Sequence, residues 1–233
     1  MKSRARRQSE KIIFITGTDT GVGKTIFTGM LVHYLRQQGV HALAMKPFCS
    51  GRRGDVKLLR AMQDVELTEE EINPFYFPKP VAPLVDARRT KRVISLAQVI
   101  RKIKKLAARC ECLLIEGSGG LLVPLGEKYM VSDVIKRLDC EVIVVARNQL
   151  GTINHTLLTV NALKRFGVKN IAVALVGTSK KDASVEKNGA LLWEFLGGIA
   201  VREVTFLGKK ANEIGVLKKS VKKMKKTLAG FCH

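Results

Sequence analysis

The sequence lacks the features that mark membrane-spanning, secreted and zinc-finger proteins. It contains no apolar run of about 18 residues, so we expect no transmembrane helix and no membrane partner. Its basic start, MKSRARRQSEK, is not followed by the apolar core of a secretion signal, so we expect none. The 5 cysteines form no Cys-x-x-Cys pair, which favours free thiols over a zinc site. Free thiols predict a reduced, cytoplasmic setting.

Acidic residues are scarce relative to basic ones. The chain has 41 Lys and Arg residues against 20 Asp and Glu residues, a formal net charge of +21. The excess is concentrated in the N-terminal tail and in residues 91–109 and 209–226. Nucleic-acid binding is one interpretation. Aromatic residues are not interleaved with these lysines, however, as stacking on single strands would require. We therefore interpret the basic stretches as solvated faces and tails, and expect no nucleic-acid partner.

What the sequence does contain is a stretch typical of a nucleoside-triphosphate loop, IIFITGTDTGVGKT at residues 12–25. A short apolar strand, a Gly- and Thr-rich loop and a helical pattern over residues 26–38 follow one another, as this loop requires. Glycines allow backbone N–H groups to close on phosphate oxygens. Lys24 can reach the β- and γ-phosphates, and the Thr25 hydroxyl can hold Mg²⁺. The first glycine is Gly17, one residue earlier than in the usual G-x4-G-K-[ST] spacing.

Strand patterns alternate with helix patterns along the rest of the chain. We expect strands at residues 40–45, 112–115, 142–146, 171–176 and 200–206, and helices at residues 56–62, 95–108, 132–138, 150–166 and 186–196. Residues 68–71 are expected to begin a loop, and Pro80 and Pro83 to keep their region out of helix. The alternation predicts an α/β fold: a doubly wound, mostly parallel sheet with helices on both faces, the Rossmann-like three-layer sandwich of P-loop NTPases.

The expected domain organisation has one globular unit between two basic segments. Residues 1–11 form a basic tail, residues 12–208 the P-loop domain, and residues 209–233 a lysine-rich segment with a marginal helix. No internal repeat is present, and the length suits one α/β domain.

Polar residues stand where expected strands end. Lys46 follows the second strand, and Glu116 ends the strand over residues 112–115. The carboxyl ends of parallel strands meet at one edge of a sheet, so we expect both residues near the phosphate loop and the turn at Leu150. A carboxylate in this place suits the Mg²⁺ side of a nucleotide site. An ordinary surface lysine and an exposed Glu in a glycine-rich turn are the simpler alternatives.

Several segments, in this order, resemble the dethiobiotin synthetase family. They are GTDTGVGKT from Gly17, MKPFCSG from Met45, NPFYFPKPVAP from Asn73, IEGSGGLLVPL from Ile115 and NQLGTINHTLLT from Asn148. The resemblance runs from about residue 12 to residue 207. It implies a homodimeric ligase that uses ATP and Mg²⁺ to close a ureido ring on 7,8-diaminononanoate with CO₂ or bicarbonate. Its products would be dethiobiotin, ADP and phosphate, formed through a carbamate and a carbamic-phosphoric anhydride.

The resemblance also implies roles for individual residues. Lys24 would hold the phosphates, Lys46 would stabilise the carbamate and its phosphorylated form, and Thr20 would contact the substrate; these are the catalytic candidates. Thr25, Asp55 and Glu116 would surround Mg²⁺. Substrate binding would involve Ser50 and, from the other subunit, Gly151, Thr152, Ile153 and Asn154. The nucleotide-binding candidates are Gly21, Val22, Gly23, Lys24, Thr25, Ile26, Asp55, Glu116, Gly117, Ser118, Gly119, Gly177, Thr178, Thr205, Phe206 and Leu207.

One departure from the family pattern leaves the nucleotide open, and two rival functions stand beside the ligase. Gly177 and Thr178 stand where the family commonly has Asn-Asp to read adenine, so CTP or another triphosphate remains open beside ATP. A cobyrinate-type amidotransferase would need a glutaminase domain, for which 233 residues leave no room. A partitioning-type ATPase that binds DNA would suit the positive charge, but its loop usually has a lysine at the position of Asp19.

Overall fold

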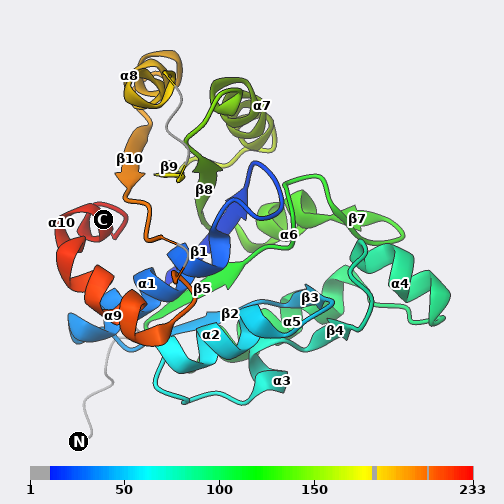
Figure 1. The fold of residues 1–233 in the computed structure, drawn as a ribbon. Coiled ribbons are helices and arrows are strands. Elements are labelled where there is room, and N and C mark those ends of the chain that lie inside the picture. The colour runs from blue at the N-terminus through cyan, green and yellow to red at the C-terminus, as the bar shows by residue number, and fades with distance from the viewer. Residues whose placement is uncertain (1–10, 180–182, 209, 233) are drawn as a thin grey trace, which may run out of the picture.

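The protein is built around one parallel sheet. The computed structural model describes residues 11–179, 183–208 and 210–232. The sheet has the order β10-β9-β8-β1-β5-β2, and all its pairings are parallel (Figure 1). Its strands are β1 (Lys11–Gly17), β2 (Ala42–Met45), β5 (Cys112–Glu116), β8 (Glu141–Arg147), β9 (Ile171–Val176) and β10 (Ala200–Val204). Each strand expected from the sequence is present, so the doubly wound α/β fold is confirmed.

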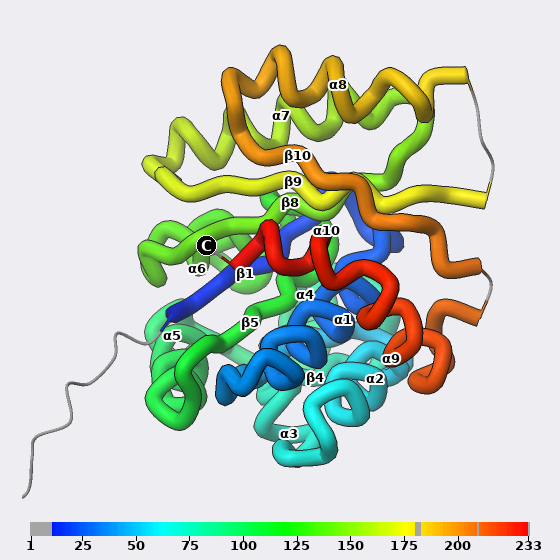
Figure 2. The backbone as a smooth tube through the Cα atoms, turned by 90° about the vertical axis from the view of Figure 1, so that its left-hand side faces the viewer, coloured from blue at the N-terminus to red at the C-terminus, as the bar shows by residue number. Residues whose placement is uncertain are grey.

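Helices cover both faces of this sheet. In Figures 1 and 2, α1 (Lys24–Gln37) lies beside α9 (Ile214–Lys223) and α10 (Lys225–Ala229). Right-handed crossovers between the parallel strands place the other long helices on the opposite face. The helices there are α5 (Leu96–Ala107), α6 (Val131–Leu138), α7 (Thr152–Arg165) and α8 (Val185–Phe195). This arrangement brings the carboxyl ends of the strands, and the loops that follow them, to one edge of the sheet.

Two further sheets, each of two strands, are separate from the main sheet. The strand β3 (Phe48–Ser50) pairs with β4 (Phe75–Phe77), and β6 (Pro124–Gly126) pairs with β7 (Tyr129–Met130). The remaining helices are α2 (Gly54–Met62), α3 (Glu69–Ile72) and α4 (Pro83–Arg89). No helix in the described ranges is both long and apolar enough to cross a membrane.

Two local predictions from the sequence are wrong. Residues 83–89 form a helix instead of staying non-helical, because Pro83 occupies its first turn, where a missing N–H costs no hydrogen bond. Residues 69–72 form a short helix instead of a loop. There the Thr68 side chain accepts a hydrogen bond from the Glu71 N–H at 3.2 Å, and the Glu71 carboxylate accepts one from the Thr68 N–H at 2.9 Å. This reciprocal cap stabilises the helix start.

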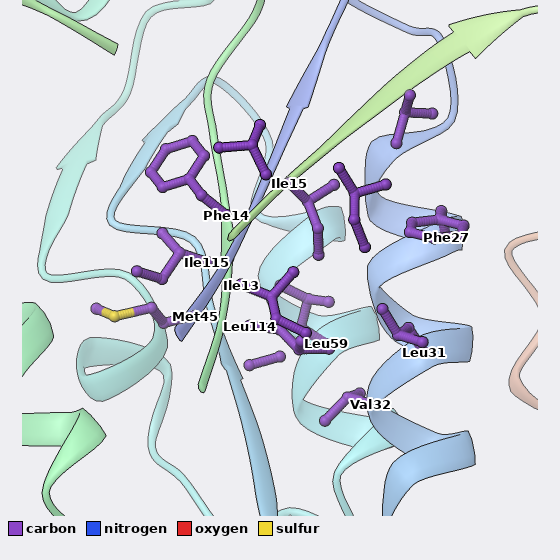
Figure 3. Packing of buried hydrophobic residues seen from close by; sticks show 14 of the residues in the cluster. Ile13, Phe14, Ile15, Phe27, Leu31, Val32, Met45, Leu59, Leu114 and Ile115 are labelled. Atoms are coloured by element: carbon purple, nitrogen blue, oxygen red, sulfur yellow. The ribbon is translucent and has the colours of Figure 1, made fainter. Parts of the chain in front are cut away.

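The core explains why β1 is apolar along its length. Figure 3 shows Ile13 and Ile15 on the side of the sheet where Phe27 and Leu31 of α1 lie, with Phe14 on the other side. Helices on both faces exclude water from both sets of side chains, so the strand shows no polar alternation. The buried strand and helix hold the phosphate loop between two rigid elements.

The lysine-rich segment at the C-terminus is packed into the same core. Leu217, Val221 and Leu228 are fully buried, and the Phe231 ring contacts the Phe27 ring edge-to-face at 5.1 Å between centroids. The marginal helix expected here is two helices, α9 and α10, whose lysines face outward. The apolar side of α9 and α10 thus completes the cover of α1.

Candidate nucleotide-binding and catalytic site

The loop between β1 and α1 has the backbone geometry of an anion site. Gly21 and Gly23 have φ angles of 73° and 104°, a left-handed region that glycine adopts without strain. A Cβ at Gly17 would lie 2.9 Å from the Val22 side chain, so the loop closes tightly there. No described side chain caps the start of α1, whose first N–H groups therefore point out of the helix without a side-chain partner. Such a helix start attracts phosphate groups.

Lys24 is held across this loop. Its Nζ donates a hydrogen bond to the Asp19 carbonyl oxygen at 2.8 Å, and the residue is buried. Burial lowers the pKa of Lys24 to about 8, although the nearby Glu116 carboxylate opposes the shift. A triphosphate bound in the loop would favour the charged form of this ammonium group.

Four predicted residues meet beside the loop. Lys46 donates from Nζ to Glu116 Oε1 at 2.7 Å and also to Asp55 Oδ2. Thr25 donates its hydroxyl to the same Glu116 oxygen at 2.7 Å. Burial by itself would lower the pKa of Lys46, but the carboxylates of Glu116 and Asp55 outweigh it and raise the pKa. Lys46 is therefore a charged ammonium at the end of β2.

The same cluster offers oxygen ligands suited to Mg²⁺. The side chain of Glu116 is fully buried, and its Oε2 has no hydrogen-bond partner among the described residues. A buried carboxylate oxygen requires a donor or a cation, and Thr25 and Asp55 supply further oxygens close by. The described residues contain no group of 3 or more His, Cys, Asp or Glu side chains able to hold a metal. Substrate phosphates and water would have to complete the coordination, as is usual for Mg²⁺.

A second glycine loop, residues 117–120, lies against the phosphate loop. A Cβ at Gly120 would lie 3.6 Å from the Gly17 carbonyl oxygen, and one at Gly119 would lie 3.5 Å from Thr20 Oγ1. Ser118 is fixed by a hydrogen bond from its Oγ to the Phe48 carbonyl oxygen at 2.5 Å. The structure therefore brings Thr20 beside Gly119, where the two loops meet.

Ser50, at the end of β3, has a buried hydroxyl with no hydrogen-bond partner among the described residues. It follows Lys46 closely in the chain, on a strand that pairs with β4 in a separate small sheet. An unsatisfied hydroxyl in this place is consistent with the predicted substrate contact.

On the other side of the phosphate loop lies a cavity of about 600 Å³. Its apolar wall includes Phe27, Met30, Val176 and Val204. A Cβ at Gly177 would lie 2.9 Å from the Phe206 backbone nitrogen, so a glycine allows these two loops to approach. The predicted nucleotide-binding residues that line the cavity are Gly21, Val22, Gly23, Ile26, Gly177, Thr178, Thr205, Phe206 and Leu207. The cavity thus unites segments far apart in the sequence.

The start of α7 does not line this cavity. Gln149 and Leu150 line it, whereas Gly151, Thr152, Ile153 and Asn154 do not. Asn154 is exposed and Thr152 is buried. The preceding turn is held by a pair of buried amides, in which Asn188 Nδ2 donates to Asn148 Oδ1 at 2.8 Å. Gly151 and Asn154 are therefore exposed at the start of α7, outside this cavity, whereas Thr152 is buried beside them.

Arg147 and Gln149 are among the cavity residues that were not predicted from the sequence. Gln149 lies in the turn before α7, and Arg147 is the last residue of β8, with Nη2 donating to the Gly21 carbonyl oxygen. The available signal was their position, directly after the β-branched run at residues 142–146, where a parallel strand reaches the ligand edge.

The solved structures that resemble this chain share its fold. A ParA family ATPase from Chlorobium tepidum TLS matches with a TM-score of 0.60 and 14% identity, covering 95% of this chain and 96% of that one. The cell division protein MinD from Aquifex aeolicus matches with a TM-score of 0.55 and 14% identity, covering 93% and 97%. These likenesses confirm the P-loop NTPase fold.

The sequence comparisons are more specific. A family model described as an AAA domain matches residues 11–209. The ATP-dependent dethiobiotin synthetase BioD of Bacillus licheniformis is 41% identical over 200 residues, which cover 84% of this chain and 85% of that protein. BioD of Anaeromyxobacter dehalogenans is 43% identical over 183 residues, covering 76% and 82%. By this similarity over most of its length, the chain is an enzyme that belongs to the ATP-dependent dethiobiotin synthetase family.

Proposed function

We propose that the protein closes the ureido ring of dethiobiotin. Its substrates would be 7,8-diaminononanoate, CO₂ and ATP, and its products dethiobiotin, ADP and phosphate. The observation that carries this proposal is the charged Lys46, fixed by Glu116 and Asp55 beside a phosphate loop. Lys46 would thus supply a cation for an anionic acceptor next to the proposed binding site of the phosphate donor. An enzyme that only hydrolyses a nucleotide would need the phosphate-donor site but no cation for an acceptor.

The proposed reaction has three steps. First, the N7 amine attacks CO₂ and loses a proton, which forms a carbamate anion that the Lys46 ammonium neutralises. The carbamate oxygen then attacks the γ-phosphorus as the bond to ADP breaks, while Lys24 and the loop N–H groups bind the transferring phosphoryl group. Last, the N8 amine attacks the carbamoyl carbon and phosphate leaves. In each step the protein mainly positions the groups and neutralises charge.

Mg²⁺ would be held by Thr25, Asp55 and Glu116, with phosphate oxygens and water as the remaining ligands. The bound ion would supply charge neutralisation at the β- and γ-phosphates. The unpaired Oε2 of Glu116 supports this proposal. Thr20 and Ser50 would orient the diamine through their hydroxyl groups.

We further propose a homodimer in the cytoplasm. The start of α7, Gly151 to Asn154, where Gly151 and Asn154 are exposed, would bind the carboxylate of the substrate held by the partner subunit, since a helix N-terminus favours anions. The free thiols of Cys49, Cys112, Cys140 and Cys232 support a reducing compartment. ATP is the proposed phosphate donor, but no Asn or Asp reads the base at Gly177 and Thr178, so CTP or another triphosphate is expected to serve as well.

The proposal is tested by mixing the protein with diaminononanoate, bicarbonate, Mg²⁺ and ATP. Dethiobiotin and phosphate should appear in equal amounts, and omitting the diamine or adding a chelator should abolish both. CTP is run in parallel. Ring closure with neither nucleotide, together with an ATPase activity that DNA stimulates and high salt suppresses, would instead favour a partitioning-type ATPase.

A further inference from the structure

Arg147 connects the edge of the sheet to the phosphate loop. It ends β8, lines the nucleotide cavity and donates from Nη2 to the carbonyl oxygen of Gly21. The guanidinium is close to the loop: Nη2 lies 3.7 Å from where a Cβ at Gly21 would be. An arginine side chain carries five N–H donors in a planar fork, so this bond leaves other donors for a ligand.

No carboxylate among the described residues forms an ion pair with Arg147. Lys46, by contrast, is paired with Glu116 and Asp55. Because Arg147 bonds to a neutral carbonyl oxygen and remains exposed, its charge is available for an anion.

The position of Arg147 indicates which anion it would meet. The cavity that it lines includes Gly21 to Gly23 and Ile26, and these are the loop and first helical turn where phosphates bind. The Lys46 cluster does not line this cavity. Arg147 is therefore on the nucleotide side of the loop, opposite the side proposed for the carbamate.

We propose that Arg147 is a phosphate-binding residue, with its guanidinium donating to the triphosphate chain of the nucleotide. This rests on the proposed use of a nucleoside triphosphate. Planar guanidinium groups form paired, charge-assisted hydrogen bonds with phosphate oxygens. Negative charge grows on the ADP oxygens as the phosphoryl group leaves, so a cation here would aid transfer as well as binding.

A structural role for the same residue makes a different prediction. If Arg147 only fixed the loop through the Gly21 carbonyl, an uncharged donor would replace it. Glutamine keeps an N–H donor and loses the charge, whereas lysine keeps the charge and loses the fork. The variants Arg147→Gln and Arg147→Lys therefore distinguish a residue that only holds the loop from a residue that binds phosphate.

The experiment measures binding of Mg²⁺-ATP by calorimetry and of inorganic tripolyphosphate by competition, without diamine or bicarbonate. Arg147→Gln should weaken both ligands about tenfold or more, as expected for a lost charged hydrogen bond, and Arg147→Lys should recover part of the loss. Arg165→Gln, which removes an exposed arginine at the end of α7, is the matched control and should bind like the parent.

If Arg147→Gln bound both ligands with the affinity of the parent, the proposal would be overturned, and Arg147 would only hold the loop through the Gly21 carbonyl. Weaker ATP binding with unchanged tripolyphosphate binding would also overturn it, because the contact would then be to the base or ribose. Since the assay contains no diamine, its result stands even if ring closure is not the reaction of this enzyme.

Discussion

Lys46 is the side chain on which the proposed chemistry depends most. It is 8% exposed, and the carboxylates of Glu116 and Asp55 keep it charged. Lys46→Ala should abolish ring closure, because the cation that neutralises the carbamate is lost. Nucleotide binding should remain largely intact, since Lys46 makes no hydrogen bond to residues 17–25 in the described structure and meets Thr25 only through the shared Glu116 oxygen. Product formation by chromatography and ATP binding by calorimetry test the two parts separately.

The substitution has a foreseeable cost in stability. It leaves the buried carboxylate of Glu116 without its ammonium partner, and breaking a buried ion pair costs about 3–5 kcal/mol. Lys46→Arg keeps a positive charge beside Glu116 and Asp55 and serves as the folded control, to be verified by thermal unfolding. If Lys46→Ala lost ATP binding together with ring closure while remaining folded, the role assigned to Lys46 would be wrong.

At the scale of elements, α9 joins the core through its apolar side. Leu217 is fully buried against α1, although it lies in a stretch dominated by lysine. Leu217→Ala should lower the free energy of unfolding by about 2–5 kcal/mol, the range for truncating a buried leucine. Lys219→Ala on the exposed side of α9 is the matched control and should be nearly neutral. Urea unfolding measures both, and equal effects would mean that α9 does not pack as described.

The same contact affects His33 on α1. Burial lowers the pKa of His33 below its usual value, and the ammonium of Lys218 on α9 lowers it further. The unfolded chain then binds more protons than the folded one as the pH falls through the unfolded value of about 6.5, so acid destabilises the fold. His33→Gln should lose less stability than the parent between about pH 7.5 and about pH 5.

Urea midpoints across this pH range provide the measurement. Lys218→Gln, which removes the neighbouring charge, should produce a smaller change in the same direction. Parallel pH profiles for the parent and His33→Gln would show that His33 contributes nothing to the acid sensitivity.

At the scale of the whole molecule, the proposed dimer predicts that two inactive variants can complement each other. In the proposed dimer, each site combines Lys46 of one subunit with the start of α7 from the other. Lys46→Ala and Asn154→Asp therefore each alter a residue that a different subunit contributes to the same site. The second variant should be inactive because a negative charge added at this helix start would repel the substrate carboxylate. Mixing the two inactive variants under subunit exchange should restore activity, with about a quarter of all sites intact for a random two-fold dimer.

Each variant exchanged with itself provides the control and should stay inactive. Size-exclusion chromatography establishes that both variants remain dimeric. A mixture as inactive as its components would place the helix start and Lys46 in the same subunit's site, whereas an Asn154→Asp variant that is active by itself would show that Asn154 has no part in it.

The succession of strands and the ligand edge could be predicted from the sequence. Apolar runs, glycine loops and helical spacing depend on residues close in the chain, so the phosphate loop, Lys46 and Glu116 could each be assigned to a strand end. The local errors at Pro83 and Thr68 have a related cause. A proline breaks the interior of a helix and a threonine caps its start, and sequence alone did not establish where these two helices begin.

The sequence by itself thus determined the fold class, the family resemblance and the residues at each strand end. Tertiary structure alone decided how these residues are paired. It placed Lys46 between Glu116 and Asp55, joined α9 to α1, and set Arg147 against the Gly21 carbonyl without a carboxylate partner in the described chain. The reason is physical: burial and Coulomb energy depend on distances between segments far apart in sequence, which only the packed fold defines.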